Sequence, residues 1–345
     1  MSVRRAKRVL IVPIFIPDQG CPHQCIFCQQ EKITSQSNQV VDVLHIRKIV
    51  DQAIASARFG SSRDREVAFY GGSFTSLSVT RMTELLEAVS PYLKKGLFKS
   101  VRISTRPDEV DEERIDLIKR LGVSTVELGV QSMDDNVLRL SMRGHTAGDT
   151  VESVKLLKRH GFRAGVQLMP GLPGDSEEGF LKSVEEVIKL QPDMARLYPT
   201  VVIRETGLDT LYKADRYQPL TLEAAVRICQ ESCIRLEDRG IPVIRIGLMS
   251  SPSLLEDGQI VAGPWHRAFG FLVRSGIHLQ AVKSCLPAPG KAEQIGIRAP
   301  NREIPLVRGY KNRGLRSIEE ITGAKVMYVR PDSSVPFGQI GVDLI

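Results

Sequence analysis

Residues 20–28 read GCPHQCIFC and place three cysteines, Cys21, Cys25 and Cys28, on one short loop. The spacing, C-x3-C-x2-C, lets this loop wrap three thiolates around a single metal centre. The loop directly follows an apolar stretch, residues 9–16, which reads as a strand. Three thiolates without an evident fourth ligand leave one metal position open, and an open position indicates catalysis rather than a structural metal site.

Two kinds of metal site remain compatible with this pattern, because soft sulfur ligands select iron–sulfur clusters or zinc. A structural zinc site needs four ligands, and His23 or His45 would have to supply the fourth since no second C-x2-C pair occurs. Disulfide bonding is disfavoured because the group is odd in number and no secretory signal is recognised. The pattern therefore favours a catalytic iron–sulfur site.

The three-cysteine loop, with Phe27 before its last cysteine and Gly71-Gly72 after the next strand, resembles the radical S-adenosylmethionine (SAM) superfamily. The resemblance implies a 4Fe–4S cluster on Cys21, Cys25 and Cys28, with its fourth iron chelated by SAM. It implies reductive cleavage of SAM to methionine and a 5′-deoxyadenosyl radical, with a reductant such as ferredoxin or flavodoxin. It also implies an α/β fold, a partial (β/α)6 TIM-like barrel.

Composition and charge set wider limits. The chain has 345 residues, of which 42% are apolar and 25% charged, as in an ordinary globular protein with one large domain and a small appendage. No apolar run approaches the roughly 20 residues of a membrane helix. Pro13 interrupts the apolar stretch near the N-terminus, which favours a strand over a signal peptide. The reactive cysteines suit a reducing compartment, so we expect a cytoplasmic protein without a membrane partner.

Strand and helix patterns alternate along the chain, which predicts a parallel sheet. The patterns predict strands at 9–15, 66–70, 100–105, 125–130, 163–169 and 194–198, and helices at 43–58, 80–93, 111–121, 146–160, 176–190 and 221–239. In parallel barrels the chemistry lies at the carboxyl ends of the strands. The cysteine loop, Gly71-Gly72, Thr105, Gln131 and the loop at 170–174 all fall at such ends.

The resemblance also implies SAM contacts at several of these strand ends. It implies that the backbone at Gly71, Gly72 and Ser73 meets the amino group of SAM, with Ser73 where glutamate is usual. It implies that Gln131 and Arg143 contact the ribose and the carboxylate. From the residues alone, a tight turn at the glycines and a surface position for the arginine are the alternatives.

Two further positions follow from the same resemblance. Thr105 stands where the porphyrinogen branch of the superfamily has an acidic ligand for the ribose. Gln167 begins a segment whose backbone meets adenine in the family. A proline-glycine loop that merely closes a strand is the alternative for this segment.

A longer match narrows the branch. Residues 196–208 read RLYPTVVIRETGL, residues 127–132 read ELGVQS and residues 143–146 read RGHT. These stretches resemble the catalytic subunit of the Elongator complex over roughly residues 10–250, which implies modification of the wobble uridine of tRNA with SAM and acetyl-CoA. This chain has a more compact cysteine loop, and residues 249–345 are too few for an acetyltransferase domain. We therefore expect an Elongator-like branch that lacks that domain.

The C-terminal third carries a second motif. We expect a radical SAM core barrel at 1–245 and a small α+β extension at 246–345. Residues 309–312 read GYKN and resemble the GXXG loop with which KH modules clamp a nucleic-acid backbone, with Asn312 in place of the second glycine. The basic residues around it, together with a net charge of +7, favour a polyanionic partner such as RNA. An amphipathic helix with a solvated basic edge is the alternative.

Three functions remain open on the sequence. The first is a radical SAM enzyme that modifies tRNA. The second is a radical SAM oxidoreductase that acts on a porphyrinogen or another small anion. The third is a non-catalytic, metal-binding RNA adaptor.

Overall fold

The computed structural model describes residues 9–17, 19–35, 41–62 and 64–345, and these form two compact units. The barrel unit contains the described chain up to Ala225 together with Arg235–Trp265. The C-terminal unit contains Val226–Ile234 and His266–Ile345. One helix, α10 (Leu222–Asp238), contributes residues to both units.

A seven-stranded sheet forms the centre of the barrel unit. Its strands are β1 (Leu10–Ile16), β2 (Arg65–Gly71), β3 (Ser100–Thr105), β4 (Val123–Gln131), β5 (Arg163–Leu168), β6 (Met194–Leu197) and β8 (Val243–Ile246). They are hydrogen-bonded in the order β1-β2-β3-β4-β5-β6-β8, and every neighbouring pair is parallel. The predicted α/β partial barrel is confirmed, with one strand more than the six that the sequence patterns indicate.

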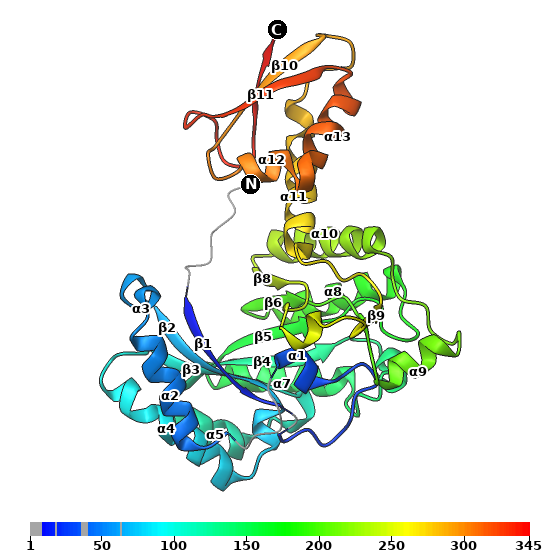
Figure 1. The fold of residues 1–345 in the computed structure, drawn as a ribbon. Helices are drawn as coiled ribbons and strands as arrows, with labels where there is room; N and C mark the ends of the chain where they lie inside the picture. The colour runs from blue at the N-terminus through cyan, green and yellow to red at the C-terminus, as the bar shows by residue number, and fades with distance from the viewer. Residues whose placement is uncertain (1–8, 18, 36–40, 63) are drawn as a thin grey trace. The chain divides into compact units, whose positions relative to one another are not determined.

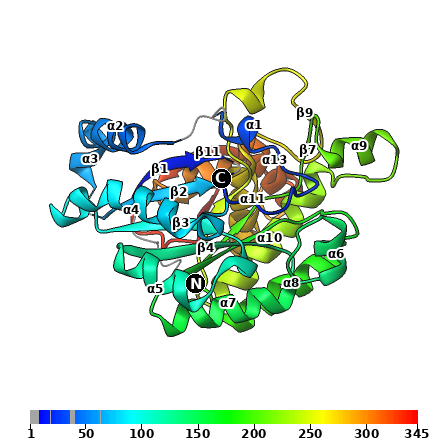
Figure 2. The same ribbon diagram turned by 90° about the horizontal axis from the view of Figure 1, so that it is seen from below.

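Helices connect the strands and cover the sheet. They are α1 (Gln30–Thr34), α2 (Val43–Ile54), α3 (Ala57–Ser61), α4 (Val79–Lys94), α5 (Glu112–Arg120), α6 (Asp135–Leu140), α7 (Ala147–Arg159), α8 (Glu177–Leu190) and α9 (Gly207–Lys213). Figures 1 and 2 show the curled sheet with α4, α5, α7 and α8 along its outer side. The carboxyl ends of the strands are followed by loops, and the predicted site residues lie there.

Side-chain caps begin the longer helices at the predicted places. Asp111, Thr146, Ser176 and Thr221 each accept a hydrogen bond from the backbone N–H three residues later, at the starts of α5, α7, α8 and α10. Such a cap stabilises a helix by about 1 kcal/mol because it satisfies an otherwise unpaired donor. The predicted helix at 43–58 is instead divided into α2 and α3, because Ser56 between them has an extended backbone.

Charged residues are buried inside the sheet and paired with one another. Arg102 on β3 donates to Oε2 of Glu66 from Nε at 2.9 Å and from Nη2 at 2.6 Å, and its Nη1 donates to Oε1 of Glu127 at 2.5 Å. The exposed fractions of Glu66, Arg102 and Glu127 are 4%, 3% and 5%. Burial alone would lower the pKa of Arg102, but the negative charges of Glu127 and Glu66 outweigh it and raise this pKa. Arg102 therefore stays cationic and links three adjacent strands.

The same network continues toward the carboxyl end of β6. Nη2 of Arg196 donates to Oε1 of Glu127 at 2.9 Å and to the Tyr70 hydroxyl at 2.7 Å. Burial, and next the negative charge of Glu127, raise the pKa of Tyr70, so its phenol stays protonated. Each charge of this network thus has an opposite charge beside it.

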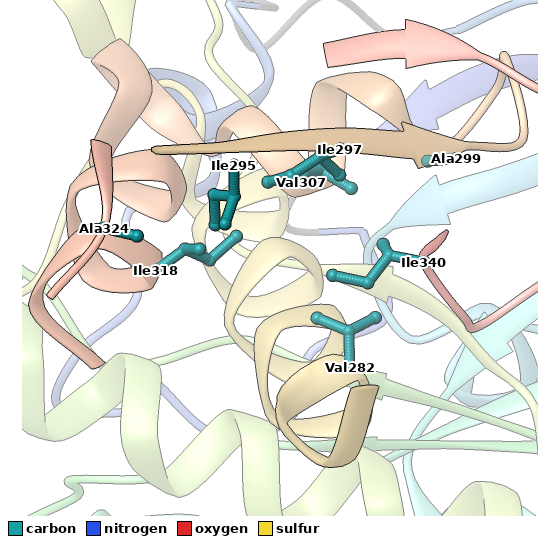
Figure 3. Close-up of a cluster of buried hydrophobic side chains, with 8 residues drawn as sticks. All are labelled: Val282, Ile295, Ile297, Ala299, Val307, Ile318, Ala324 and Ile340. Atoms are coloured by element: carbon teal, nitrogen blue, oxygen red, sulfur yellow. The ribbon is translucent and has the colours of Figure 1, made fainter. Parts of the chain in front are cut away.

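The C-terminal unit is a small mixed α+β layer structure, as predicted for the extension. It contains α11 (Phe269–Val282), β10 (Gln294–Ala299), α12 (Ile304–Arg308), α13 (Arg313–Thr322), β11 (Lys325–Pro331) and β12 (Gly341–Leu344). β10 lies in the middle, parallel to β11 and antiparallel to β12. Figure 3 shows its apolar core, in which Ile295 and Ile297 of β10 face Ile318 of α13 and Val282 of α11.

Within the described residues, every helix is too short or too polar to span a lipid bilayer.

The buried charge network yields a stability prediction. Replacing Arg102 with methionine leaves Glu66 and Glu127 buried without a counter-charge, which we expect to cost about 3–5 kcal/mol of unfolding free energy. Lys189→Ala is the control, because Lys189 and Glu186 form a solvent-exposed ion pair worth at most about 1 kcal/mol. Urea unfolding of both variants measures the difference, and equal destabilisation would contradict this role for Arg102.

Candidate functional site

The cysteine loop, residues 20–28, follows β1 and is held by backbone contacts from two other segments. The N–H of Ile26 donates to the carbonyl of Ser141 at 3.2 Å, and the carbonyl of Ile26 accepts from the N–H of Leu208 at 2.7 Å. Gly207 allows the second contact, because a Cβ atom there would lie 2.7 Å from Cγ1 of Ile26. The segment between Cys25 and Cys28 is therefore fixed by Ser141, which follows α6, and by the first turn of α9.

The three predicted cluster ligands, Cys21, Cys25 and Cys28, form no disulfide. Nη1 of Arg143 donates to Sγ of Cys25 at 2.9 Å, and Nε2 of Gln30 donates to Sγ of Cys21 at 3.5 Å. Among the described residues, no three His, Cys, Asp or Glu side chains lie close enough together to hold one metal ion, and this includes the three cysteines. The ligand assignment stays a prediction, and it requires the three thiols to converge from these positions.

Glycines bring the loop after β2 against the loop after β1. A Cβ atom on Gly72 would lie 1.9 Å from the carbonyl oxygen of Gln19, and one on Gly20 would lie 2.3 Å from that of Ser73. The N–H groups of Gly72 and Ser73 donate to the carbonyls of Ile16 and Gln19, each at 3.0 Å. Larger residues would force the two backbones apart. The glycine motif thus has a structural reason beside its predicted contact with SAM, which remains a prediction.

A cluster of buried hydroxyls lies at the carboxyl ends of β2 and β3. The Thr105 hydroxyl is 3.0 Å from the Ser73 hydroxyl and 2.5 Å from the Thr75 hydroxyl, and it accepts from the Thr75 N–H at 3.3 Å. A hydroxyl has one donor and two acceptor positions. Thr105 therefore uses its capacity within the protein, and its predicted role toward the ribose of SAM remains a prediction.

Gln131, Gln167 and Arg143 are brought together at the ends of β4 and β5. Nε2 of Gln167 donates to Oε1 of Gln131 at 3.2 Å. Nη2 of Arg143 donates to the carbonyl of Gly129 at 2.6 Å, and a Cβ atom on Gly129 would lie 3.0 Å from Nε2 of Gln131. Gln131 has a left-handed backbone, with φ of 67°. That conformation ends β4 and turns the chain at the point where the predicted SAM contacts meet.

His145 is a buried member of this region that the sequence patterns did not single out. Its Nε2 lies 3.2 Å from the carbonyl oxygen of Val130, so Nε2 carries the proton and donates. Burial, and next the charge of Arg143, lower the pKa of His145 to about 3. The imidazole is neutral at physiological pH, and its Nδ1 has no hydrogen-bond partner among the described residues. The only sequence feature that could have pointed to His145 is its position two residues after Arg143.

The residues that follow α6 therefore act as one unit against the cysteine loop. Arg143 is 6% exposed, and its backbone carbonyl accepts a hydrogen bond from Nη2 of Arg106, next to Thr105 on β3. Gly144 has φ of 75°, and a Cβ atom there would lie 2.5 Å from the His23 ring. The thiol of Cys25 is thus buried and accepts a hydrogen bond from Arg143, in the turn after α6 that also packs against the His23 ring. This arrangement can hold an anionic ligand beside a sulfur-ligated metal.

Comparison with family models matches most of the chain. The model for the radical SAM superfamily matches residues 15–187, and that for the radical SAM C-terminal domain matches residues 192–278. The first match contains the end of β1, the cysteine loop and the four parallel strands β2 to β5.

Two of the similar proteins are named as tRNA-modifying enzymes, and a third is named as a subunit of the Elongator complex. The chain is 28% identical over 346 residues to a tRNA uridine(34) acetyltransferase from Methanocaldococcus infernus, covering 89% of this chain and 64% of that protein. It is 30% identical to a tRNA uridine(34) acetyltransferase from Dehalococcoides mccartyi, covering 63% and 54%. It is 29% identical to Elongator complex protein 3 from Schizosaccharomyces pombe, covering 65% and 49%. The chain spans less than two thirds of the length of these relatives.

The fold agrees with a solved structure of the same group. The Elp3 of Methanocaldococcus infernus with an N-terminal deletion superposes with a TM-score of 0.60 and 24% sequence identity, covering 79% of this chain and 63% of that chain. The likeness supports the partial barrel. With the family match over residues 15–187 and the cysteine spacing, the conclusion is that the chain belongs to the radical SAM superfamily of enzymes.

Proposed function

We propose that this chain is a radical SAM enzyme that modifies the wobble uridine of tRNA. The observation that carries the proposal is the hydrogen bond to Cys25 from Arg143, in the turn after α6, together with the contact between Gln131 and Gln167 at the ends of β4 and β5. This constellation fits an anionic cofactor beside the cysteine loop. The choice of tRNA is supported by the names of the relatives, one of which aligns with 89% of the chain.

The residues present fit the cofactors that the superfamily uses. The donor set is three free thiols on one loop, and thiolate sulfur is the usual ligand of iron–sulfur clusters. Three protein ligands leave the fourth iron for SAM. Oxygen ligands that would favour magnesium or calcium are absent from residues 20–28, which contain no Asp or Glu. We therefore assign the cluster to Cys21, Cys25 and Cys28.

When bound, the cluster and SAM supply the reductive cleavage of SAM to methionine and a 5′-deoxyadenosyl radical. Arg143 is suited to hold the carboxylate of SAM, because a guanidinium donates two parallel hydrogen bonds to a carboxylate. Gln131 and Gln167 offer amide donors and acceptors to the ribose and the adenine. The neutral imidazole of His145 adds no second positive charge beside Arg143. A ferredoxin or flavodoxin is the proposed reductant.

The neighbouring backbone and hydroxyl groups have a positioning role in this proposal. Gly71 and Gly72 let the β2 loop pack tightly against the loop after β1, and in this proposal the backbone carbonyls of the β2 loop meet the amino group of SAM. Ser73 and Thr105 hold that loop to β3 through buried hydroxyl contacts. The site therefore depends on the fit between three strand-end loops more than on any one of them.

The first prediction concerns the cluster. Cys25→Ala removes one of three thiolates, so we expect loss of iron and sulfide uptake on anaerobic reconstitution and no 5′-deoxyadenosine from SAM. Cys285→Ala is the matched control, because Cys285 lies in the C-terminal unit and is free of disulfides. Iron and sulfide analysis and chromatography of the nucleoside measure both outcomes. Retention of cluster and SAM cleavage by Cys25→Ala would reject the assignment.

A second prediction separates SAM binding from cluster binding. Arg143→Lys keeps the charge but loses the two-pronged donor, so we expect intact iron content and a KM for SAM raised about tenfold, the effect of roughly 1.4 kcal/mol. Arg139→Lys is the control, because Arg139 is exposed on α6 and bonds only Asn136. Initial rates of deoxyadenosine formation at varied SAM concentration give kcat and KM. An unchanged KM in Arg143→Lys would remove Arg143 from the SAM site.

The third prediction tests the substrate. Reconstituted protein, reductant and SAM are incubated with two tRNA transcripts that differ only by uridine or cytidine at position 34, with and without acetyl-CoA. We expect a new nucleoside, found by mass spectrometry of the digested RNA, from the uridine transcript alone. Deoxyadenosine formation without any new nucleoside from the uridine transcript would show that the wobble uridine is not the substrate.

A further inference from the structure

The C-terminal unit carries a concentrated, unneutralised positive charge. Between Glu303 and Glu319 the sequence contains no Asp or Glu, yet it contains four cations. We call these four residues the basic turn: Arg308, Lys311, Arg313 and Arg316. All four are exposed, and none forms an ion pair with another described residue.

Two other arginines of the C-terminal unit, Arg298 and Arg330, are paired with carboxylates. On the sheet, Nη1 of Arg298 lies 2.7 Å from Oδ2 of Asp332, and its Nε lies 2.9 Å from Oδ1 of Asp343. Arg330 lies 3.4 Å from Oδ2 of Asp343. The unit therefore has carboxylates that neutralise arginines on the sheet, while the basic turn has none. The contrast marks the turn as a surface that is kept positive.

The position of the basic turn works against helix stability. Arg313 and Arg316 lie in the first turn of α13, which has no acidic residue, and Asn312 provides no side-chain cap. The amino end of a helix carries partial positive charge, so cations there destabilise the helix. These cations destabilise the helix end and have no carboxylate partner among the described residues. A polyanion bound from outside the chain would supply the negative charge that they lack.

Aromatic rings lie beside these cations. The rings of His266 and Tyr310 meet edge to face with centroids 4.8 Å apart, and Nζ of Lys311 lies 5.7 Å from the centroid of the Tyr310 ring. Burial, and then the charges of Arg313, Lys311 and Arg267, lower the pKa of His266. The local potential is thus positive around two rings that are partly exposed. A basic surface with aromatic rings is the usual makeup of a single-stranded nucleic-acid site.

Two glycines set the shape of this surface. A Cβ atom on Gly314 would lie 2.2 Å from the carbonyl oxygen of Val307, and one on Gly309 would lie 2.7 Å from the N–H nitrogen of Gly314. The ends of α12 and α13 therefore approach closely, and the chain between them turns through left-handed residues at 311 and 312. This tight turn projects Lys311 and Arg313 from neighbouring positions at the same corner.

We propose that the basic turn binds the phosphate backbone of RNA, with Tyr310 available to stack on a base. The choice of RNA rests on the proposed function, whereas the polyanion-binding surface rests on the charges and rings of the C-terminal unit. The binding is electrostatic and independent of base sequence, because these side chains are flexible cations rather than a rigid set of base-reading groups. It serves to hold the substrate on the enzyme.

The test compares two full-length variants that each lose two positive charges. Lys311→Gln with Arg313→Gln removes charge from the basic turn, and Lys291→Gln with Lys325→Gln removes it from exposed positions elsewhere in the unit. Fluorescence anisotropy measures binding of a labelled, unmodified tRNA transcript at several salt concentrations. We expect the first variant to bind about tenfold more weakly near 0.1 M salt and to reduce the salt slope by about 2, and the second to bind as the parent protein does.

Binding is measured without SAM or reductant, so its outcome is separate from the modification assay. Equal weakening in both variants, or in neither, would overturn the proposal. Equally tight, basic-turn-dependent binding of a poly-glutamate peptide would also overturn it, since the surface would then accept any polyanion. Arg316→Gln is a further, single-charge variant of the basic turn. Arg316 lies within α13, beyond the left-handed residues, so we expect weaker RNA binding with unchanged far-ultraviolet circular dichroism.

Discussion

The hydrogen bond from Arg143 to Cys25 is the contact on which the candidate site depends. One guanidinium donates to the Cys25 thiol with Nη1 and to the Gly129 carbonyl with Nη2, while the backbone carbonyl of the same residue accepts from Arg106. The loops after β1, β3 and β4 therefore meet at a single buried side chain. Neighbouring residues must bend around it, which explains the left-handed backbone at Met142 and Gly144. A group held this firmly can both orient a thiolate and present its remaining hydrogen-bonding capacity to a ligand.

Local chemistry made much of the barrel predictable. The helices that begin at Asp111, Thr146, Ser176 and Thr221 follow from capping residues before apolar stripes, and the structure has caps at those four places. The parallel order of the sheet follows from strand–helix alternation. The cysteine loop and the glycine pair fall at strand ends as expected, because the carboxyl ends of parallel strands gather at one edge.

Features that depend on tertiary contacts could not be predicted from the sequence patterns. The strand β8 is short and partly exposed, and it is a strand because it pairs with the edge of β6 rather than because of its own pattern. Arg102, Glu66 and Glu127 look like solvent-facing positions of half-buried strands, yet they neutralise one another inside the sheet. The contact between Gly72 and the Gln19 carbonyl, and the burial of His145, likewise arise from loops that are distant in sequence.

The net charge of +7 does not show which cations are paired with carboxylates and which are not. In the barrel unit, Arg102 and Arg196 are buried against carboxylates, because an unpaired charge there would cost several kcal/mol. In the C-terminal unit, the cations of the basic turn are exposed and unpaired, and they stand at a helix end that disfavours them. The interior charges stabilise the fold without changing the field outside the protein, since their signs cancel. The long-range attraction for a polyanion must therefore come from unpaired surface cations such as those of the basic turn, and total charge alone cannot locate them.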